Sequence, residues 1–328
     1  CRICESMPFG RVMSGRPRTE LLFLYGAVLA CVICFQKRIS LQKRWMLVFC
    51  GAALLFLPAK GGFEITFLDV GQGDCIHIKS AAGHHYLVDG GSSSVSKAGV
   101  YRIIPYLKYQ GADEVEAVFV THPDSDHCSG ILELFQEGEE EGIRVKNLYL
   151  PEIGEEFREE GYRALVAAAQ EAGACVGYTG RGDVFCKGEM ELRCLHPERG
   201  YGSPEPNQYS TVLLLRYGYF TALLTGDVEG EGERELAGSL EEAEIENITV
   251  LKAAHHGSAN STPEEILSRL SPEYTVISCG KNNRYGHPHR ELTERLRAQG
   301  TEILITYESG AVTFRIDGER MRVREFLR

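Results

Sequence analysis

Six consecutive residues, His122-Pro-Asp-Ser-Asp-His127, contain four side chains of metal-ligating type. They follow Val115–Thr121, a short apolar run that predicts a buried strand. In a tight loop at the end of a strand, alternate side chains can turn toward one point, and imidazole and carboxylate donors bind divalent cations at about 2.0–2.2 Å. The loop therefore predicts a metal centre, although Pro123 and Ser125 are also ordinary turn residues.

Other polar residues close apolar, strand-like runs elsewhere in the chain. Asp89 ends Tyr86-Leu-Val-Asp, Asp227 ends Leu223-Leu-Thr-Gly-Asp, and His255-His256 follow Val250-Leu-Lys-Ala-Ala. Because the loops that follow strands commonly carry chemistry, we expect all of these residues at one edge of a sheet system.

The metal loop is similar to the His-x-His-x-Asp-His signature of the metallo-β-lactamase superfamily, with Asp124 in place of the second His. Further motifs occur in order: Phe67-Leu-Asp-Val-Gly-Gln-Gly-Asp74, Leu224-Thr-Gly-Asp227, His255-His-Gly-Ser258 and Asn283-Arg-Tyr-Gly-His-Pro288. With them, residues 62 to 328 resemble the C-terminal domain of the ComEC family of competence DNA-uptake channels.

Strands in two groups with interleaved helices predict an α/β architecture with layered sheets. The resemblance implies that this architecture is the metallo-β-lactamase-like αββα sandwich. We expect strands near 63–69, 75–78, 85–88, 115–121, 145–150, 190–195, 210–217, 220–224, 248–252, 274–279, 302–306 and 311–316, and helices near 100–109, 129–135, 155–172, 231–237, 263–270 and 290–298.

The sequence predicts two parts: a membrane segment at residues 1–61 and a hydrolase domain at residues 62–328. Two apolar runs predict two transmembrane helices at about 20–36 and 45–59, and buried core helices or a signal segment are the alternatives. The loop at 36–44 carries four Lys and Arg residues. The positive-inside rule makes that loop cytoplasmic and the C-terminal domain extracytoplasmic, although Arg11, Arg16 and Arg18 weaken this orientation. Since the chain begins with Cys1, we expect a fragment of a longer membrane protein.

Charge argues against passive DNA binding by the larger domain. The chain has a formal net charge of −11, and residues 1–60 hold nine Lys and Arg against two Asp and Glu. The remaining residues therefore carry 26 basic and 44 acidic side chains. Any affinity for nucleic acid must come from metal ions and local basic residues.

The resemblance implies two divalent ions, Mn²⁺ or Zn²⁺ ahead of Mg²⁺. His122 and Asp124 would serve one metal, Asp126 and His127 the other, Asp227 would bridge them, and His255 would be the last ligand. An Asp at position 124 makes the first site harder and more anionic, which favours Mn²⁺ or Mg²⁺ over Zn²⁺.

Several residues are left open between binding a metal and orienting a ligand: Asp74, Asp89, His196, Asn207 and His256. Asp89 is expected to hold a metal-ligating His. His196 and Asn207 compete for the third ligand of the first metal, and His196 could equally cap a strand. Adjacent side chains on an extended backbone point to opposite sides, so one of His255 and His256 is expected to bind the metal and the other to orient it or contact substrate. His255 is favoured as the ligand.

Phosphate needs charge-neutralising donors beyond the metals. Lys281, Arg284 and Ser258 are candidates for substrate binding, and His287 joins Asp126 and Asp227 as a catalytic candidate. Lys252 is expected either near phosphate or at a solvated strand end.

The resemblance implies a metal-dependent DNA phosphodiesterase that degrades or processes incoming DNA, with DNA, the membrane, the uptake machinery and the upstream channel as partners. The alternatives are a small-ester, lactone or phosphodiester hydrolase of the same superfamily and a non-catalytic module that guides DNA.

Overall fold

The computed structural model describes residues 13, 15–56 and 61–327. By its internal contacts the chain divides into two units. One unit takes residues 1–61 and 106–113, and the other takes residues 62–105 and 114–328.

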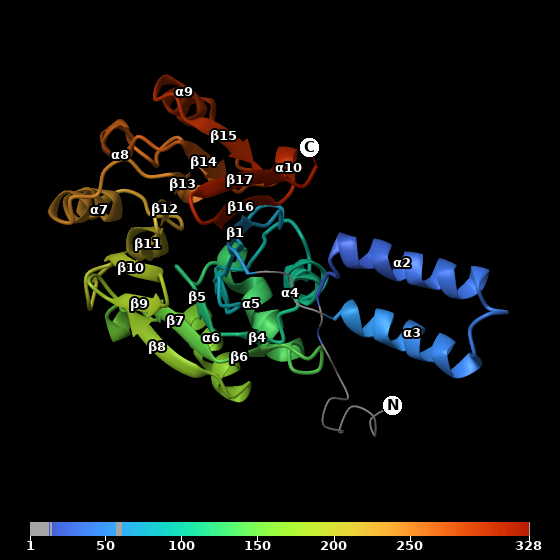
Figure 1. Ribbon diagram of the computed structural model, residues 1–328. Coiled ribbons are helices and arrows are strands. Elements are labelled where there is room, and N and C mark those ends of the chain that lie inside the picture. The colour runs from blue at the N-terminus through green and yellow to red at the C-terminus, as the bar shows by residue number, and fades with distance from the viewer. Residues whose placement is uncertain (1–12, 14, 57–60, 328) are drawn as a thin grey trace. The chain divides into compact units, whose positions relative to one another are not determined.

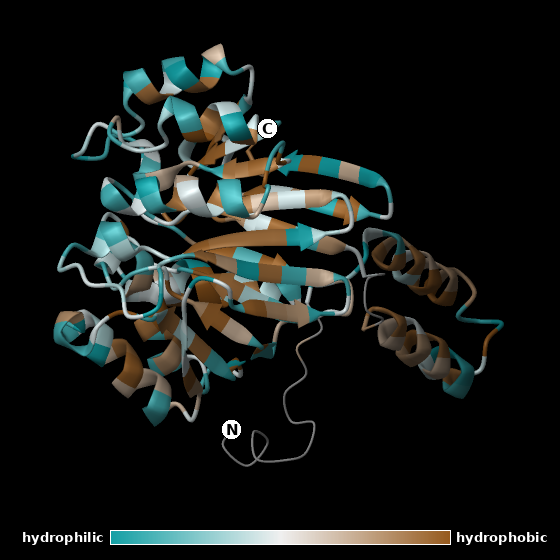
Figure 2. Ribbon diagram, turned by 90° about the vertical axis from the view of Figure 1, so that its left-hand side faces the viewer, coloured by the Kyte–Doolittle hydropathy of each residue, from teal (hydrophilic) through white to brown (hydrophobic). Residues whose placement is uncertain are grey.

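The first unit contains a pair of antiparallel helices, α2 (Thr19–Cys34) and α3 (Leu41–Leu54) (Figure 1). Gly51 lies close beneath the Tyr25 ring, where a Cβ atom would come within 2.9 Å of it. Both helices are mostly apolar, as the brown colour in Figure 2 shows, and Phe23 and Phe49 are strongly exposed.

Two transmembrane helices were expected in this unit, and the structure does not confirm them. The helices have 16 and 14 residues. Within the described part of the chain, no helix combines the length and the apolar character needed to cross a membrane. Residues 57–60, which belong to the second expected span, lie outside the described residues.

Two mixed sheets form the centre of the second unit. The first sheet has the strand order β17 (Arg320–Glu325), β16 (Val312–Asp317), β1 (Phe63–Phe67), β2 (Ile76–Lys79), β3 (His85–Val88), β5 (Ala117–Phe119), β7 (Asn147–Pro151) and β8 (Cys175–Thr179). The second has the order β15 (Glu302–Ile305), β14 (Tyr274–Ile277), β13 (Val250–Lys252), β12 (Phe220–Leu224), β11 (Val212–Tyr217), β10 (Met190–His196) and β9 (Val184–Lys187). A short pair, β4 (Glu114–Val115) and β6 (Arg144–Val145), stands apart.

The main core lies between the two sheets. Period-two alternation along the strands turns one set of side chains inward, so Phe63 and Phe67 of β1 share a cluster with Leu213 of β11 and Phe220 of β12. A second cluster on the other face of the second sheet packs it against α7 (Glu231–Glu242), α8 (Glu264–Leu270) and α9 (Arg290–Ala298).

Helices also cover the first sheet, so the layers run helix, sheet, sheet, helix (Figure 1). The remaining helical elements are η1 (Gly99–Ile103), α4 (Ile104–Gln110), α5 (Ser125–Glu137), η2 (Glu155–Phe157), α6 (Glu160–Glu171), η3 (Pro206–Tyr209), η4 (Ala254–Gly257) and α10 (Thr306–Ser309). The expected α/β architecture is confirmed.

The part of each sheet that matters for the site is parallel. Strands β3, β5, β7 and β8 run parallel in the first sheet, as do β12, β13, β14 and β15 in the second. Parallel strands share one carboxyl edge, so the loops that follow them can meet at one place.

Candidate metal centre

The candidate residues follow the carboxyl ends of the parallel strands. Asp89 comes directly after β3, the metal loop follows β5, Asp227 follows β12, and His255 and His256 lie in η4 after β13. Residues far apart in the sequence are thereby brought to one place between the two sheets.

The metal loop leads straight into helix α5, which begins at Ser125 rather than near residue 129 as expected. Asp124 caps the helix with an extended backbone, and Asp126 and His127 lie in the first turn. A carboxylate in the first turn of a helix is favoured by the helix dipole. The start of the helix therefore divides the four candidate ligands of the loop into two pairs. The outer pair, His122 and Asp124, precedes the helix, and the inner pair, Asp126 and His127, lies in its first turn.

The inner pair belongs to a buried group in which two imidazole rings meet one carboxylate. The Nε2 atom of His127 lies 3.2 Å from Oδ2 of Asp227, and Nε2 of His256 lies 3.3 Å from the same oxygen. The two Nε2 atoms are 3.3 Å apart, and Oδ2 of Asp126 is 3.6 Å from Nε2 of His256. His127, His256 and Asp227 are all at most 3% exposed.

The other nitrogen of each ring is held by an acceptor. Nδ1 of His127 lies 2.9 Å from Oδ2 of Asp89, and Nδ1 of His256 lies 2.9 Å from the carbonyl oxygen of Ser278. An acceptor at Nδ1 places the proton there and leaves a lone pair on Nε2. Without a cation, the nearby carboxylates favour a second proton on Nε2 of His127, and a divalent cation would take the place of that proton between the two rings and Asp227. These residues fit a metal ion.

The charged side chains in and around this buried group strongly shift one another's pKa values. Burial raises the pKa of Asp227, but His127, His256 and Lys252 outweigh it and hold the pKa well below its usual range. Burial lowers the pKa of His127, but Asp227 and Asp89 outweigh it and raise the pKa well above its usual range. Asp227 thus stays ionised and available as a ligand.

The outer pair is more open. Nε2 of His122 is buried, meets no hydrogen-bond partner among the described residues, and lies 3.7 Å from Oδ2 of Asp124. Nδ1 of His122 faces the hydroxyl groups of Thr121 at 3.1 Å and Ser210 at 3.4 Å. The Asp124 side chain is 51% exposed. A neutral imidazole and a half-exposed carboxylate fit one side of a second cation.

Neither candidate for a third ligand of the outer pair points toward it. Nε2 of His196 donates to the carbonyl oxygen of Gln208 at 2.6 Å, and Nδ1 lies 3.6 Å from Glu235. Asn207 hydrogen-bonds Glu229 through its side chain and accepts from the Glu229 amide at 3.3 Å through its carbonyl. His196 is thus held by a local hydrogen bond, which was the other role considered for it.

The structure brings His256, not His255, into the buried group. Both residues have left-handed backbone conformations, with φ of 48° and 52°, so the two rings diverge in a way that an extended backbone would not allow. Nδ1 of His255 pairs with Oε2 of Glu229 at 2.7 Å, and its Nε2 stays 4.0 Å from Asp227. The geometry therefore favours His256 as the ligand, the reverse of the expected choice.

The loop between β14 and α9, residues 278–289, lines the outer side of the candidate metal centre. The His287 ring lies beside those of His255 and Tyr285, and burial lowers its pKa to about 4. The exposed Arg284 guanidinium stacks over Tyr285 and is influenced by the charge of Asp126. Lys281 is also exposed. Ser258, in contrast, is buried, and its hydroxyl accepts from the amide of Asn260.

Sequence reasoning missed the role of Lys252, which is fully buried rather than solvated. Its ammonium group pairs with Asp74, contacts the carbonyl oxygen of Gly226 at 2.6 Å and lies 3.3 Å from Oδ1 of Asp227. The available signal was a cation inside the apolar run Val250 to Ala254. Glu229 was also missed, and nothing in its acidic neighbourhood distinguishes it.

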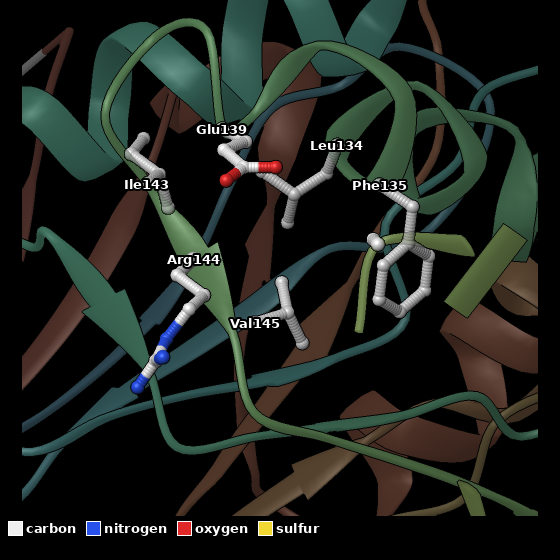
Figure 3. A pocket seen from close by; sticks show the side chains of 7 residues that line it. Leu134, Phe135, Glu139, Ile143, Arg144 and Val145 are labelled. Atoms are coloured by element: carbon white, nitrogen blue, oxygen red, sulfur yellow. The ribbon is translucent and has the colours of Figure 1, made fainter. Parts of the chain in front are cut away.

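A small pocket at the other end of α5 contains none of these residues (Figure 3). Its lining includes Leu134, Phe135 and Ile143, together with Glu139 and Arg144. The mostly apolar lining and the absence of candidate ligands separate this pocket from the metal centre.

The comparisons with known proteins agree with the fold and the geometry. Residues 68–281 match the family model described as metallo-beta-lactamase superfamily. The chain therefore belongs to this superfamily. Among solved structures, CmlA, a diiron beta-hydroxylase from Streptomyces venezuelae, shares the fold with a TM-score of 0.50 and 14% identity, over 88% of this chain and 59% of that one.

Within the superfamily, the relatives of this chain include competence proteins of the ComEC family, which confirms the resemblance. ComE operon protein 3 of Bacillus subtilis is 30% identical over 93% of this chain and 40% of its own length. Competence protein ComA of Neisseria gonorrhoeae is 28% identical over 92% of this chain and 40% of its own length. Recombination protein 2 of Haemophilus influenzae is 28% identical over 85% of this chain and 32% of its own length. The chain thus spans less than half of each relative.

Proposed function

We propose that this chain is a metal-dependent phosphodiesterase that cleaves DNA during DNA uptake. The observation that carries the proposal is the convergence of two imidazole Nε2 atoms on one carboxylate oxygen in a buried group. Membership of the metallo-β-lactamase superfamily supports metal-dependent hydrolysis, and the names of the competence relatives support DNA as the substrate.

His127, His256, Asp227 and Asp126 would hold one divalent cation, and His122 and Asp124 would contribute to a second. When bound, the cations supply Lewis acidity and lower the pKa of a water molecule. Asp89 and the Ser278 carbonyl fix the two rings, so little reorganisation is needed at the metal.

The loop at residues 278–289 would receive the phosphate. Arg284 carries a permanent positive charge at the mouth and can donate to a phosphate oxygen. Its neighbour Lys281 can add a second charge. His287, with its lowered pKa, is neutral near pH 7 and can contribute a hydrogen bond rather than a charge. The buried walls around Asp227 limit the access of bulk water.

A cleavage assay on the full chain tests the proposal. Metal-stripped protein is incubated with single-stranded and double-stranded DNA while Mn²⁺, Zn²⁺ or Mg²⁺ is added in turn, with Asp227→Asn as the control variant. We expect cleavage that requires metal and is lost in the variant. Cleavage by the variant at the wild-type rate would refute the metal centre as the catalytic site. A folded chain that binds less than one ion per molecule under saturating Mn²⁺ and cleaves no DNA would instead indicate a module that guides DNA.

A second candidate, hydrolysis of a small ester, lactone or phosphodiester, is favoured by the acidic charge. Residues 61–328 carry 26 basic and 44 acidic side chains, which repels a polyanion at a distance. A substrate panel under the same metal conditions separates the two candidates. Faster turnover of a small ester than of DNA would support the second.

We also propose that the chain acts at the cell membrane, as part of a longer channel protein, with residues 62–328 on the extracytoplasmic side. The four Lys and Arg residues at 36–44 support this orientation. Protease accessibility in intact and permeabilised cells tests it, and a domain protected from external protease in intact, wall-free cells would refute it.

A further inference from the structure

We propose that Lys252 is a positioning residue of the metal centre, and that Asp74 is its counter-ion rather than a metal ligand. This inference rests on the proposed metal-dependent function. Asp74 is one of four buried residues whose donor atoms lie within 4.8 Å of one another, together with His127, Asp227 and His256. Proximity alone would therefore make Asp74 a ligand.

The position of Asp74 relative to the two rings argues otherwise. Its Oδ2 atom lies 3.7 Å from Nδ1 of His127 and 4.0 Å from Nδ1 of His256. These are the nitrogens that face Asp89 and the Ser278 carbonyl. The ligand lone pairs are on Nε2, where Asp227 and Asp126 are found. Asp74 thus lies behind the rings, away from the point at which the donors converge.

The Lys252 ammonium lies directly beside Asp74. An ammonium group has three hydrogens, and three oxygen acceptors surround this one: Oδ2 of Asp74, the carbonyl oxygen of Gly226, and Oδ1 of Asp227. Lys252 is 0% exposed and Asp74 is 0% exposed. A buried charge is tolerated when it is paired. The Lys252 ammonium is paired in this way, while Oδ1 of Asp74 meets no hydrogen-bond partner among the described residues.

The contact between Lys252 and Asp227 fixes the orientation of the Asp227 carboxylate. Lys252 holds Oδ1, so Oδ2 alone is turned toward the two Nε2 atoms. Asp227 is then presented to a cation through one oxygen in a fixed orientation. The ammonium also offsets part of the negative charge that Asp74, Asp89, Asp126 and Asp227 concentrate in a small volume.

This arrangement predicts opposite effects for residues in front of the rings and behind them. Removing a ligand weakens metal binding. Removing Lys252 frees an oxygen of Asp227 and unpairs Asp74, so a cation should bind more tightly because it now replaces the lost positive charge. The loosened Asp227 should at the same time support slower turnover, because its orientation is no longer fixed.

Mn²⁺ affinity of the full chain tests the inference without any DNA. The variants are Asp74→Asn, Lys252→Met and the double variant, with Asp126→Asn as the ligand control. We expect Mn²⁺ affinity to be weaker for Asp74→Asn, because the unpaired Lys252 ammonium then repels the cation, about tenfold tighter for Lys252→Met, and at least tenfold weaker for Asp126→Asn. The double variant removes Asp74 without leaving an unpaired ammonium, and binding in this variant as weak as that of Asp126→Asn would show Asp74 to be a ligand and overturn the inference.

Lys252→Met leaves Asp74 unpaired and can prevent folding, and the double variant removes both charges to avoid this. We expect the double variant to melt cooperatively, to bind Mn²⁺ at least as tightly as wild type, and to have a kcat at least tenfold lower with an unchanged KM. Wild-type kcat in the folded double variant would refute a positioning role. A wild-type chain that binds Mn²⁺ but cleaves no DNA would refute the proposed function while leaving the affinity test intact.

Discussion

The two halves of the metal loop differ in how much of their geometry the protein fixes in advance. In the inner half, Asp89 and the Ser278 carbonyl orient the rings of His127 and His256. In the outer half, His122 is oriented only by hydroxyl groups, and its neighbour Asp124 is half exposed. The comparison teaches that candidate ligands only a few residues apart can differ in how firmly the fold fixes their orientation.

The hydrogen-bond and ion-pair partners explain the difference. The inner residues lie in the first turn of α5 and between the two sheets, where neighbouring backbone and carboxylates surround them. The outer residues precede the helix, and of these His122 is buried while Asp124 is half exposed. A rigid inner site suits a cation that stays bound, while an open outer site suits one that also contacts the substrate.

The largest expected effect comes from replacing one histidine in each half. His127→Ala should lower Mn²⁺ affinity by about 100-fold or more and abolish cleavage, since even partners that only orient a ligand contribute 10–100-fold. His122→Ala should leave one bound ion per chain. Metal titration by isothermal calorimetry measures both variants. Equal losses in the two variants would contradict the division into unequal halves.

A smaller effect is expected from the residue that orients the inner half. Asp89→Asn removes the carboxylate at Nδ1 of His127 and should lower metal affinity by about 10–100-fold while leaving the fold intact. Asp113→Asn, an exposed aspartate outside the site, serves as the matched control. If both variants bind Mn²⁺ like wild type, the orientation of His127 does not depend on Asp89.

The residue at position 124 offers a test of metal preference in the outer half of the loop. Asp124→His restores the His-x-His-x-Asp-His signature and supplies a softer donor beside His122. We expect the ratio of Zn²⁺ to Mn²⁺ affinity at the outer site to rise by about tenfold, with the inner site unchanged. Competition between the two ions, followed by bound-metal analysis, measures this ratio. An unchanged ratio would show that donor type at position 124 does not set metal preference.

Much of the fold and the position of the site could be predicted, because polar residues that close apolar runs are visible in a sequence. Asp89, Asp227 and the metal loop all follow strands that were expected near the observed positions. Strand β12 was expected at 220–224 and spans Phe220–Leu224. Three strands, β8, β9 and β17, were not expected. In β17, the alternation of Arg320, Arg322 and Arg324 with Met321 and Val323 is the strand signal that was overlooked.

The contacts within the site could not be predicted, because they depend on backbone conformation and burial. An extended backbone was assumed for His255 and His256, and their left-handed φ angles reverse which ring joins the buried group with His127 and Asp227. In the sequence, Lys252 resembles a solvated strand end, and its complete burial is a property of the folded sheets. His196 and Gln208 meet only because β10 and η3 are close in the fold.

The smallest effect on the metal centre is expected at His196, whose role is structural. His196→Gln should bind Mn²⁺ like wild type, in contrast to His127→Ala. Loss or weakening of the hydrogen bond to Gln208 should lower the free energy of unfolding at pH 7.5 by about 1 kcal/mol.

The pH dependence of that difference tests the assignment further. Burial lowers the pKa of His196 from 6.5 to about 4. Between these values the unfolded chain takes up a proton that the folded chain does not, so this histidine destabilises the fold as pH falls through the window. The difference in stability should therefore shift by up to about 2–3 kcal/mol in favour of His196→Gln between pH 7.5 and pH 4, which removes its deficit and makes the variant the more stable protein at the lower pH. Urea unfolding at several pH values measures this change, and a deficit that stays constant with pH would mean that His196 becomes protonated in the folded chain as readily as in the unfolded one.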